Sequence, residues 1–195
     1  MKKILFLFLA ACFFFSCEKE TIVIPQQHAG RTVLAFFWAD NSLNSSLRDN
    51  IQTMMQGLQA MKDSAALLVY WDGEASDISW PEPCIVEYVT NGQGGINSLS
   101  KGTIDAMMAD KNTSIYDLIG IGNIRKKYPP QTSTEKTVMQ TVIGDMMSAY
   151  PSESYGIIFG SHGSGWLPTI TGTRSIGQDG GRYSSDTALI PELAE

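Results

Sequence analysis

Continuous apolar runs mark the strands of this chain. Thr32 to Trp38, Ala65 to Trp71 and Tyr155 to Phe159 are each of strand length and almost wholly apolar. Such runs are typical of strands buried on both faces of a sheet. Cys84 to Val89 is a shorter candidate that half alternates between apolar and polar residues, so we expect it nearer to an edge. The pattern predicts a buried sheet in which residues 155–159 form a central strand.

Amphipathic helices separate these runs. Apolar residues recur at steps of four and three along the first of them: Leu47, Ile51, Met54, Leu58 and Met61. This spacing places them on one face of a helix. A second helix is predicted from Thr134 to Tyr150, where Pro151 ends it, and a short third one around residues 104–108. Because strands and helices alternate, we predict an α/β fold, a three-layer sandwich with a mainly parallel sheet.

The N-terminal residues have the pattern of an export signal. Two lysines precede an unbroken apolar run from Ile4 to Phe15. This run is too short to span a bilayer as a helix, but it suits the core of a signal peptide. Ser16-Cys17 follows and resembles the lipobox of bacterial lipoproteins, which implies that Cys17 carries the lipid and becomes the mature N-terminus. The alternative is an ordinary secretory signal in which Cys17 has no special role.

This N-terminal pattern predicts the organisation of the rest of the chain. We expect a lipoprotein signal peptide at residues 1–16, a tether at 17–31 and one folded domain at 32–195. The protein would then sit in the bacterial cell envelope, attached to the membrane through its lipid, on the periplasmic face or at the cell surface.

Composition excludes several classes of protein. Hydrophobic residues make up 43% of the 195 residues and charged residues 17%, which indicates a globular domain and not a disordered or fibrous chain. The net charge is −6, so binding to a phosphate backbone, and hence to nucleic acid, is not expected. Three cysteines in this length do not make a disulfide scaffold.

His162 is the candidate for chemistry. It lies three residues beyond the last predicted strand and is followed by Gly163-Ser164-Gly165. Ligands of open α/β sheets bind beyond the carboxyl ends of the strands, so the location suits a site. The other histidine, His28, falls in the tether, and the chain has neither a metal-spaced His or Cys pair nor a glycine-rich phosphate loop with a lysine. No metal or cofactor is therefore expected.

Three stretches together resemble the clostripain family of cysteine peptidases. They are the turn Ala39-Asp40-Asn41-Ser42-Leu43, the passage from Ala149 to Phe159, and Ser161-His162-Gly163-Ser164-Gly165-Trp166. The resemblance implies a caspase-like fold, with His162 as the catalytic histidine and the backbone N–H of Gly163 as a donor to the oxyanion. It also implies cleavage of peptide or protein substrates after Arg or Lys.

The family's nucleophile is missing from these residues. In the family a cysteine follows the next strand in an Asp-Ala-Cys context, and no such motif lies after Trp166. Cys12 belongs to the signal peptide, and Cys17 is the candidate for lipid attachment. Cys84 precedes His162 and begins an apolar run, so we expect it to be a buried hydrophobic residue. We expect the chain alone not to hydrolyse peptides, and we prefer a truncated gene or partial sequence to a processed light chain. We also expect one apolar edge of the sheet to be left unpaired.

Two other functions stay open at this point. A strand that ends in His-Gly-Ser-Gly also resembles the oxyanion loop of esterases with the α/β-hydrolase fold. A non-catalytic lipoprotein that binds peptides or glycans through Trp71, Trp80 and Trp166 is the third alternative.

Overall fold

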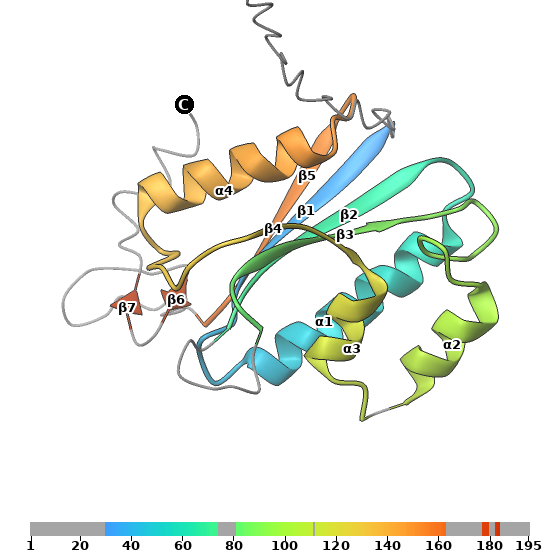
Figure 1. Cartoon of the computed structure of the whole chain (residues 1–195), viewed down its shortest axis with the longest axis horizontal. Coiled ribbons are helices and arrows are strands. Elements are labelled where there is room, and N and C mark those ends of the chain that lie inside the picture. Colours follow the sequence, from blue (N-terminus) through green and yellow to red (C-terminus); the bar gives the residue numbers. More distant parts are fainter. Residues whose placement is uncertain (1–29, 74–80, 111, 163–176, 180–181, 184–195) are drawn as a thin grey trace, which may run out of the picture.

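A mixed five-stranded sheet forms the centre of the molecule (Figure 1). The computed structural model describes residues 30–73, 81–110, 112–162, 177–179 and 182–183. The elements in chain order are β1 (Arg31–Trp38), α1 (Asn44–Ala60), β2 (Ala65–Asp72), β3 (Cys84–Val89), α2 (Lys101–Ala109), α3 (Ile115–Ile121), β4 (Asn123–Lys127), α4 (Lys136–Ala149), β5 (Tyr155–Gly160), β6 (Gln178–Asp179) and β7 (Arg182–Tyr183).

The order of the strands across the sheet is β4-β3-β2-β1-β5. β1 runs parallel to both of its neighbours, β2 and β5, whereas β3 pairs antiparallel with β2 and with β4. The predicted α/β fold class is confirmed, with parallel pairing limited to β2, β1 and β5. β3 is not an edge strand, because β4 covers it.

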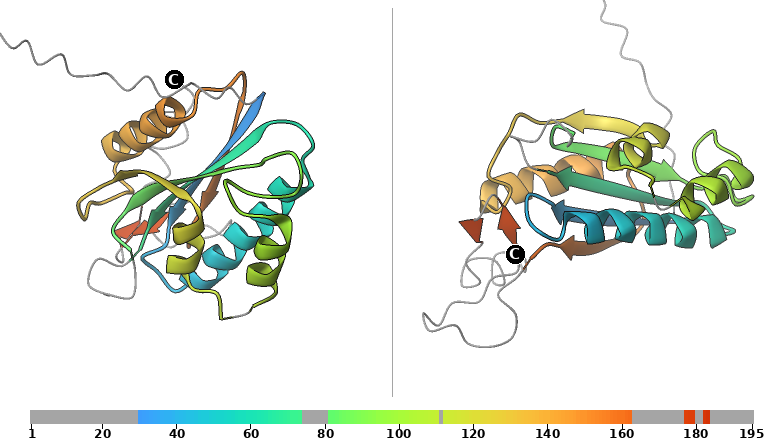
Figure 2. Two further views of the ribbon diagram at one scale, coloured as in Figure 1. Left: turned by 45° about the vertical axis from the view of Figure 1, so that its right-hand side comes forward. Right: turned by 90° about the horizontal axis from the view of Figure 1, so that it is seen from below.

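Helices cover both faces of the sheet, α1, α2 and α3 on one side and α4 on the other (Figure 2). A hydrophobic core lies on each face. Along β1, Ala35 and Phe37 pack with α1, α2 and α3, while Leu34 and Phe36 pack with α4. Successive side chains of a strand point to opposite faces, so a strand between two helix layers must be apolar at every position. This geometry explains the continuous apolar runs and confirms the predicted layers.

Four elements were not predicted, α3, β4 and the short strands β6 and β7, and one strand was placed wrongly. α3 and β4 were missed, since β4 reads Asn-Ile-Arg-Lys-Lys and all five residues are exposed. β5 was predicted to be central, but within the described sheet it lies at the edge. Strand order depends on pairing between distant segments, which a hydrophobic run does not specify.

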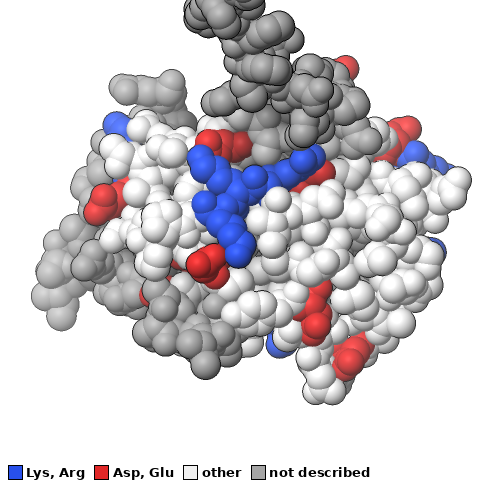
Figure 3. Space-filling view, viewed as in Figure 1, with Lys and Arg blue, Asp and Glu red and all other residues white. Residues whose placement is uncertain are grey.

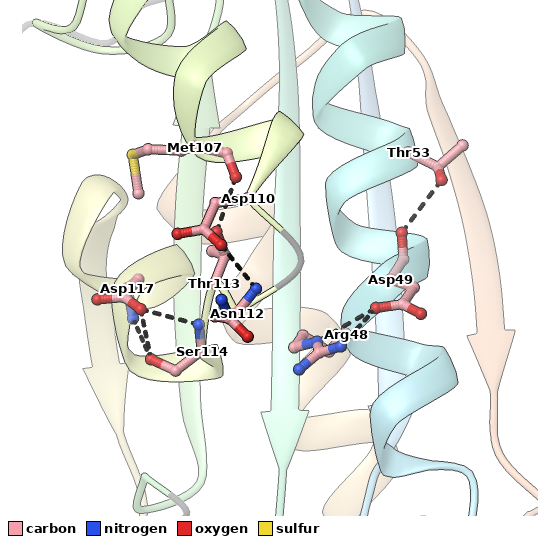
Figure 4. Close-up of polar contacts among 9 residues, drawn as sticks. All are labelled: Arg48, Asp49, Thr53, Met107, Asp110, Asn112, Thr113, Ser114 and Asp117. Atoms are coloured by element: carbon pink, nitrogen blue, oxygen red, sulfur yellow. Dashed lines mark hydrogen bonds and ion pairs between the residues drawn. The ribbon is translucent and has the colours of Figure 1, made fainter.

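The turn between α2 and α3 is held by local hydrogen bonds (Figure 4). The Thr113 hydroxyl donates to the Met107 carbonyl at the end of α2, with an oxygen–oxygen distance of 2.7 Å. At the start of α3, Ser114 and Asp117 cap each other: the Ser114 N–H donates to Asp117 Oδ2 at 2.8 Å, and the Asp117 N–H donates to Ser114 Oγ at 3.1 Å. This capping box fixes the start of α3, whose buried residues Ile115, Leu118 and Ile119 lie on one face of the helix.

Candidate functional site

The carboxyl ends of β2, β1 and β5 lie side by side. Trp38 of β1 is in register with Asp72 of β2, and the preceding residue Phe37 is in register with Gly160 of β5. The small hairpin of β6 and β7 lies beyond these ends (Figures 1 and 2). This is the edge of the sheet at which sequence analysis placed the site.

The buried indole of Trp38 is held by several contacts at this edge of the sheet. Its ring is fully buried and stacks on Phe159 of β5, with ring centroids 5.5 Å apart. Its indole N–H donates to the Ser133 carbonyl at 2.7 Å, and the Ser133 hydroxyl donates to the buried carboxylate of Asp72. Gly177, next to β6, packs so closely on the indole that a Cβ there would lie 3.1 Å from the ring. Sequence analysis missed Ser133, because no local pattern links it to β1 and β2.

His162 lies two residues beyond the end of β5. The residue is partly buried, and its Nδ1 is enclosed and has no hydrogen-bond partner within the described part of the chain. Gly163, the predicted oxyanion donor, lies outside the described residues.

The path of the chain into His162 is fixed by close packing. A Cβ built on Gly160 would lie 2.6 Å from the Phe37 ring and 2.8 Å from Leu47 Cδ2. The backbone at the end of β5 therefore rests directly on β1 and α1. Any larger residue here would force the Phe37 ring and the Leu47 side chain to shift, since real Cβ contacts are essentially never this short.

Cys84 and Trp71 have structural roles. Cys84 is 1% exposed, and burial raises the pKa of its thiol to about 11, so it stays protonated and inert near neutral pH. The prediction of a buried hydrophobic residue is confirmed. Trp71 is fully buried, so it is not one of the exposed aromatics that the binding-lipoprotein alternative requires. Trp80, Trp166 and the proposed lipid site Cys17 lie outside the described residues.

The outer edge of β5 has no partner strand among the described residues, and its side chains are apolar. Ile157 and Ile158 point to opposite faces of the sheet and are each 44% exposed. Ile158 lines an apolar groove of about 340 Å³ with Met54, Gly57 and Met61, between β5 and α1. His162 thus follows directly from an edge strand that, in the described part of the sheet, exposes Ile157 and Ile158 to solvent.

Comparisons with known proteins agree with this architecture. The sequence profile of the clostripain family, peptidase family C11, matches residues 35–195. The chain belongs to the clostripain family. The membership argues against the esterase alternative. A search of curated proteins found no match.

Solved structures of clostripain-family proteases resemble the chain. A B. fragilis cysteine protease is 27% identical with a TM-score of 0.50, over 72% of this chain and 95% of the other. A secreted C11 cysteine protease from Bacteroides thetaiotaomicron, solved with an irreversible peptide inhibitor, is 26% identical with a TM-score of 0.52, over 85% of this chain and 38% of the other. A second such protease, "iotapain", is 15% identical with a TM-score of 0.52, over 42% of its length. The chain therefore spans less than half the length of the two secreted proteases.

Neither a membrane span nor a metal cluster is present in the described part of the chain. No described helix is both long and apolar enough to cross a bilayer. No group of three or more His, Cys, Asp or Glu side chains among the described residues is placed to hold a metal ion.

Proposed function

We propose that this chain supplies the histidine-bearing part of a clostripain-type cysteine endopeptidase. The observation that carries the proposal is the position of His162, just beyond the carboxyl end of a strand that lies at the edge of the described sheet. A nucleophile on a strand added to that edge would follow its own carboxyl end beside His162, because parallel neighbours end at the same side of the sheet.

The proposed chemistry divides between this chain and the added strand. His162 keeps the cysteine as a thiolate, which attacks the substrate carbonyl, and then gives the proton to the leaving amine. The backbone N–H of Gly163 stabilises the negative charge that develops on the carbonyl oxygen. Water then hydrolyses the acyl-enzyme, with His162 acting as base.

No cysteine of this chain is suited to be the nucleophile. Cys84 begins β3, which β2 and β1 separate from β5, and its thiol is buried with a raised pKa. Cys12 lies in the proposed signal peptide, and Cys17 is the proposed site of lipid attachment. The secreted protease with the bound peptide inhibitor is more than twice as long as the region it shares with this chain, which leaves room for a nucleophile-bearing segment.

Two finer parts of the proposal concern substrate and location. We propose cleavage after Arg or Lys, as the resemblance to the family implies. We also propose export and lipid attachment at Cys17, which fits the description of two related proteases as secreted. Labelling with a fatty-acid analogue should mark the wild-type chain, and Cys17→Ser should abolish the label; equal labelling of both would contradict the lipid anchor.

The decisive experiment measures hydrolysis of Arg-amide and Lys-amide peptides. The 195-residue chain alone should show no activity above background. In the longer protein that includes a nucleophilic cysteine, His162→Ala should lower kcat/KM by about 10²–10⁴, the usual contribution of a positioned acid/base.

His28→Ala is the matched control, since His28 is the only other histidine of the chain. It should leave the rate unchanged. Wild-type rates in His162→Ala would refute the role of His162, and hydrolysis by the purified 195-residue chain would refute the need for an added nucleophile.

A further inference from the structure

Asn41 connects three segments that meet at the carboxyl edge of the sheet. Its side-chain Nδ2 donates to the carbonyl of Trp38, the last residue of β1, at 2.6 Å. The same nitrogen donates to Ser161 Oγ at 3.2 Å, across 120 positions of sequence. Its Oδ1 accepts from the N–H of Leu43, directly before α1, at 2.9 Å. One amide thus joins β1, α1 and the segment that carries His162.

The position of His162 depends on contacts that neighbouring residues make. Its Nδ1 has no hydrogen-bond partner in the part of the chain described here, so no bond from that nitrogen fixes the imidazole. Acid/base residues are usually oriented by a hydrogen bond to the second ring nitrogen. In the described part of the chain the restraints come from the residues just before His162: the close packing at Gly160, and the hydrogen bond from the Asn41 side chain to the Ser161 hydroxyl.

We infer that Asn41 is a positioning residue for His162. It acts through Ser161 and does not touch the reacting atoms. The role in catalysis rests on the proposed function, whereas the restraint on His162 does not. An aspartate or alanine at this position would lose the N–H donor that reaches both Trp38 and Ser161.

The chain offers a matched control at the opposite end of the sheet. Asn97 also joins three segments: its Oδ1 accepts from Val89 N–H at 3.0 Å, and its Nδ2 donates to the carbonyls of Ile121 at 2.9 Å and Glu87 at 3.3 Å. These residues belong to the ends of β3 and α3, away from β5. Asn97→Ala therefore removes three such side-chain hydrogen bonds, as Asn41→Ala does, but leaves the bond from Asn41 to Ser161 intact.

The first measurement follows acylation of the two histidines by diethyl pyrocarbonate, read by mass spectrometry on the full chain. His28 is the internal reference. Asn41→Ala should raise the His162 rate relative to His28 by about fivefold, the population change that corresponds to one lost hydrogen bond. Ser161→Ala, a smaller change that keeps the bonds of Asn41 to Trp38 and Leu43, should raise it in the same direction. The double variant should raise the His162 rate by less than the product of the two separate increases, because both substitutions remove the same contact between Asn41 and Ser161.

Asn97→Ala tests whether the effect of Asn41→Ala on His162 comes only from a general loss of stability. Asn97→Ala should lower the midpoint of urea unfolding at least as much as Asn41→Ala does, because Asn97 has a positive φ of 52° that alanine tolerates poorly. It should leave the His162 rate at its wild-type value. An unchanged rate in both Asn41→Ala and Ser161→Ala, or an equal rise in Asn97→Ala, would overturn the inference.

The second measurement is made on the longer peptidase. Asn41→Ala should lower kcat by about 10²-fold, as expected for a small displacement of a reacting group, and change KM little. If Asn41→Ala raises the His162 acylation rate but His162→Ala leaves kcat unchanged, the proposed function fails while the restraint of His162 by Asn41 stands. If His162→Ala abolishes activity but the acylation rate in Asn41→Ala is unchanged, the positioning role fails alone.

Discussion

The two edge strands of the sheet have opposite character. β4 is exposed along its whole length, and three of its five residues are basic, whereas β5 exposes Ile157 and Ile158. Each basic residue of β4 has an acidic partner: Arg125 pairs with Glu87, Lys126 with Asp145 and Lys127 with Glu82. Basic side chains accordingly gather in a band with acidic ones at its borders (Figure 3).

This difference shows which edge is built to face water. Charged side chains on an edge strand oppose pairing with another chain, because a second strand would have to bury them. β4 fits that rule and β5 does not. An open backbone edge flanked by two isoleucines and an apolar groove is a surface suited to a further strand, which is where the proposed nucleophile would be carried.

The largest effect should be on self-association. The purified chain should form oligomers at micromolar concentration by pairing through β5, and Ile158→Lys should shift it toward monomer in sedimentation velocity. Ile124→Lys is the matched control, because Ile124 is 48% exposed on β4 and should not contribute to association. A monomeric wild-type chain, or the same shift with both variants, would show that the two edges do not differ in this way.

How far sequence alone predicts these edges depends on the residues concerned. The runs that became β1, β2 and β5 were predicted within a residue or two. β1 and β2 are covered on both faces and must be apolar throughout, whereas β5 keeps an apolar run although its side chains are partly exposed. β4 was missed because an exposed edge strand needs no hydrophobic residues. α3 was also missed, although Ser114 and Asp117 at capping-box spacing were a usable signal.

The candidate site was inferred from the same kind of local pattern. His162 was chosen for its place after an apolar run and for its glycine-rich neighbours. Asn41 was noticed only within the resemblance to the family, and its bond to Ser161 joins residues 120 positions apart. Such a contact follows from the pairing of β1 with β5, and no local pattern contains it.

The next effect concerns stability on the β4 side. Glu87 has only 2% of its side chain exposed, and its carboxylate pairs with the guanidinium of Arg125. Arg125→Ala leaves that carboxylate buried without its cation, which should lower the free energy of unfolding by about 1–3 kcal/mol. Lys127→Ala is the control: both partners of the Lys127–Glu82 pair are at least 60% exposed, so its loss should cost about 0.5 kcal/mol or less. If urea unfolding gave equal losses of unfolding free energy for Arg125→Ala and Lys127→Ala, the burial of Glu87 would add nothing to the contribution of its ion pair.

The smallest effect is the pH dependence of the contact between β4 and α4. Burial would raise the pKa of Asp145, but hydrogen bonds from Lys126 Nζ at 2.5 Å and Tyr128 OH at 2.7 Å outweigh it and hold the pKa below its ordinary value. Burial, together with the hydrogen bond to Asp145, raises the pKa of the Tyr128 hydroxyl.

A carboxylate whose pKa is depressed by folding stabilises the native state above its unfolded pKa, about 3.9 for Asp, and this stabilisation is lost as the pH falls through the native value. Asp145→Asn should therefore lower the unfolding free energy by a similar small amount from pH 5 to 8, about 0.2–1 kcal/mol for a half-exposed pair. The difference from wild type should shrink toward pH 3. Urea unfolding of both proteins across this range measures it, and a difference that grew in acid would reverse the sign assigned to Asp145 and weaken the view that β4 is held by paired charges.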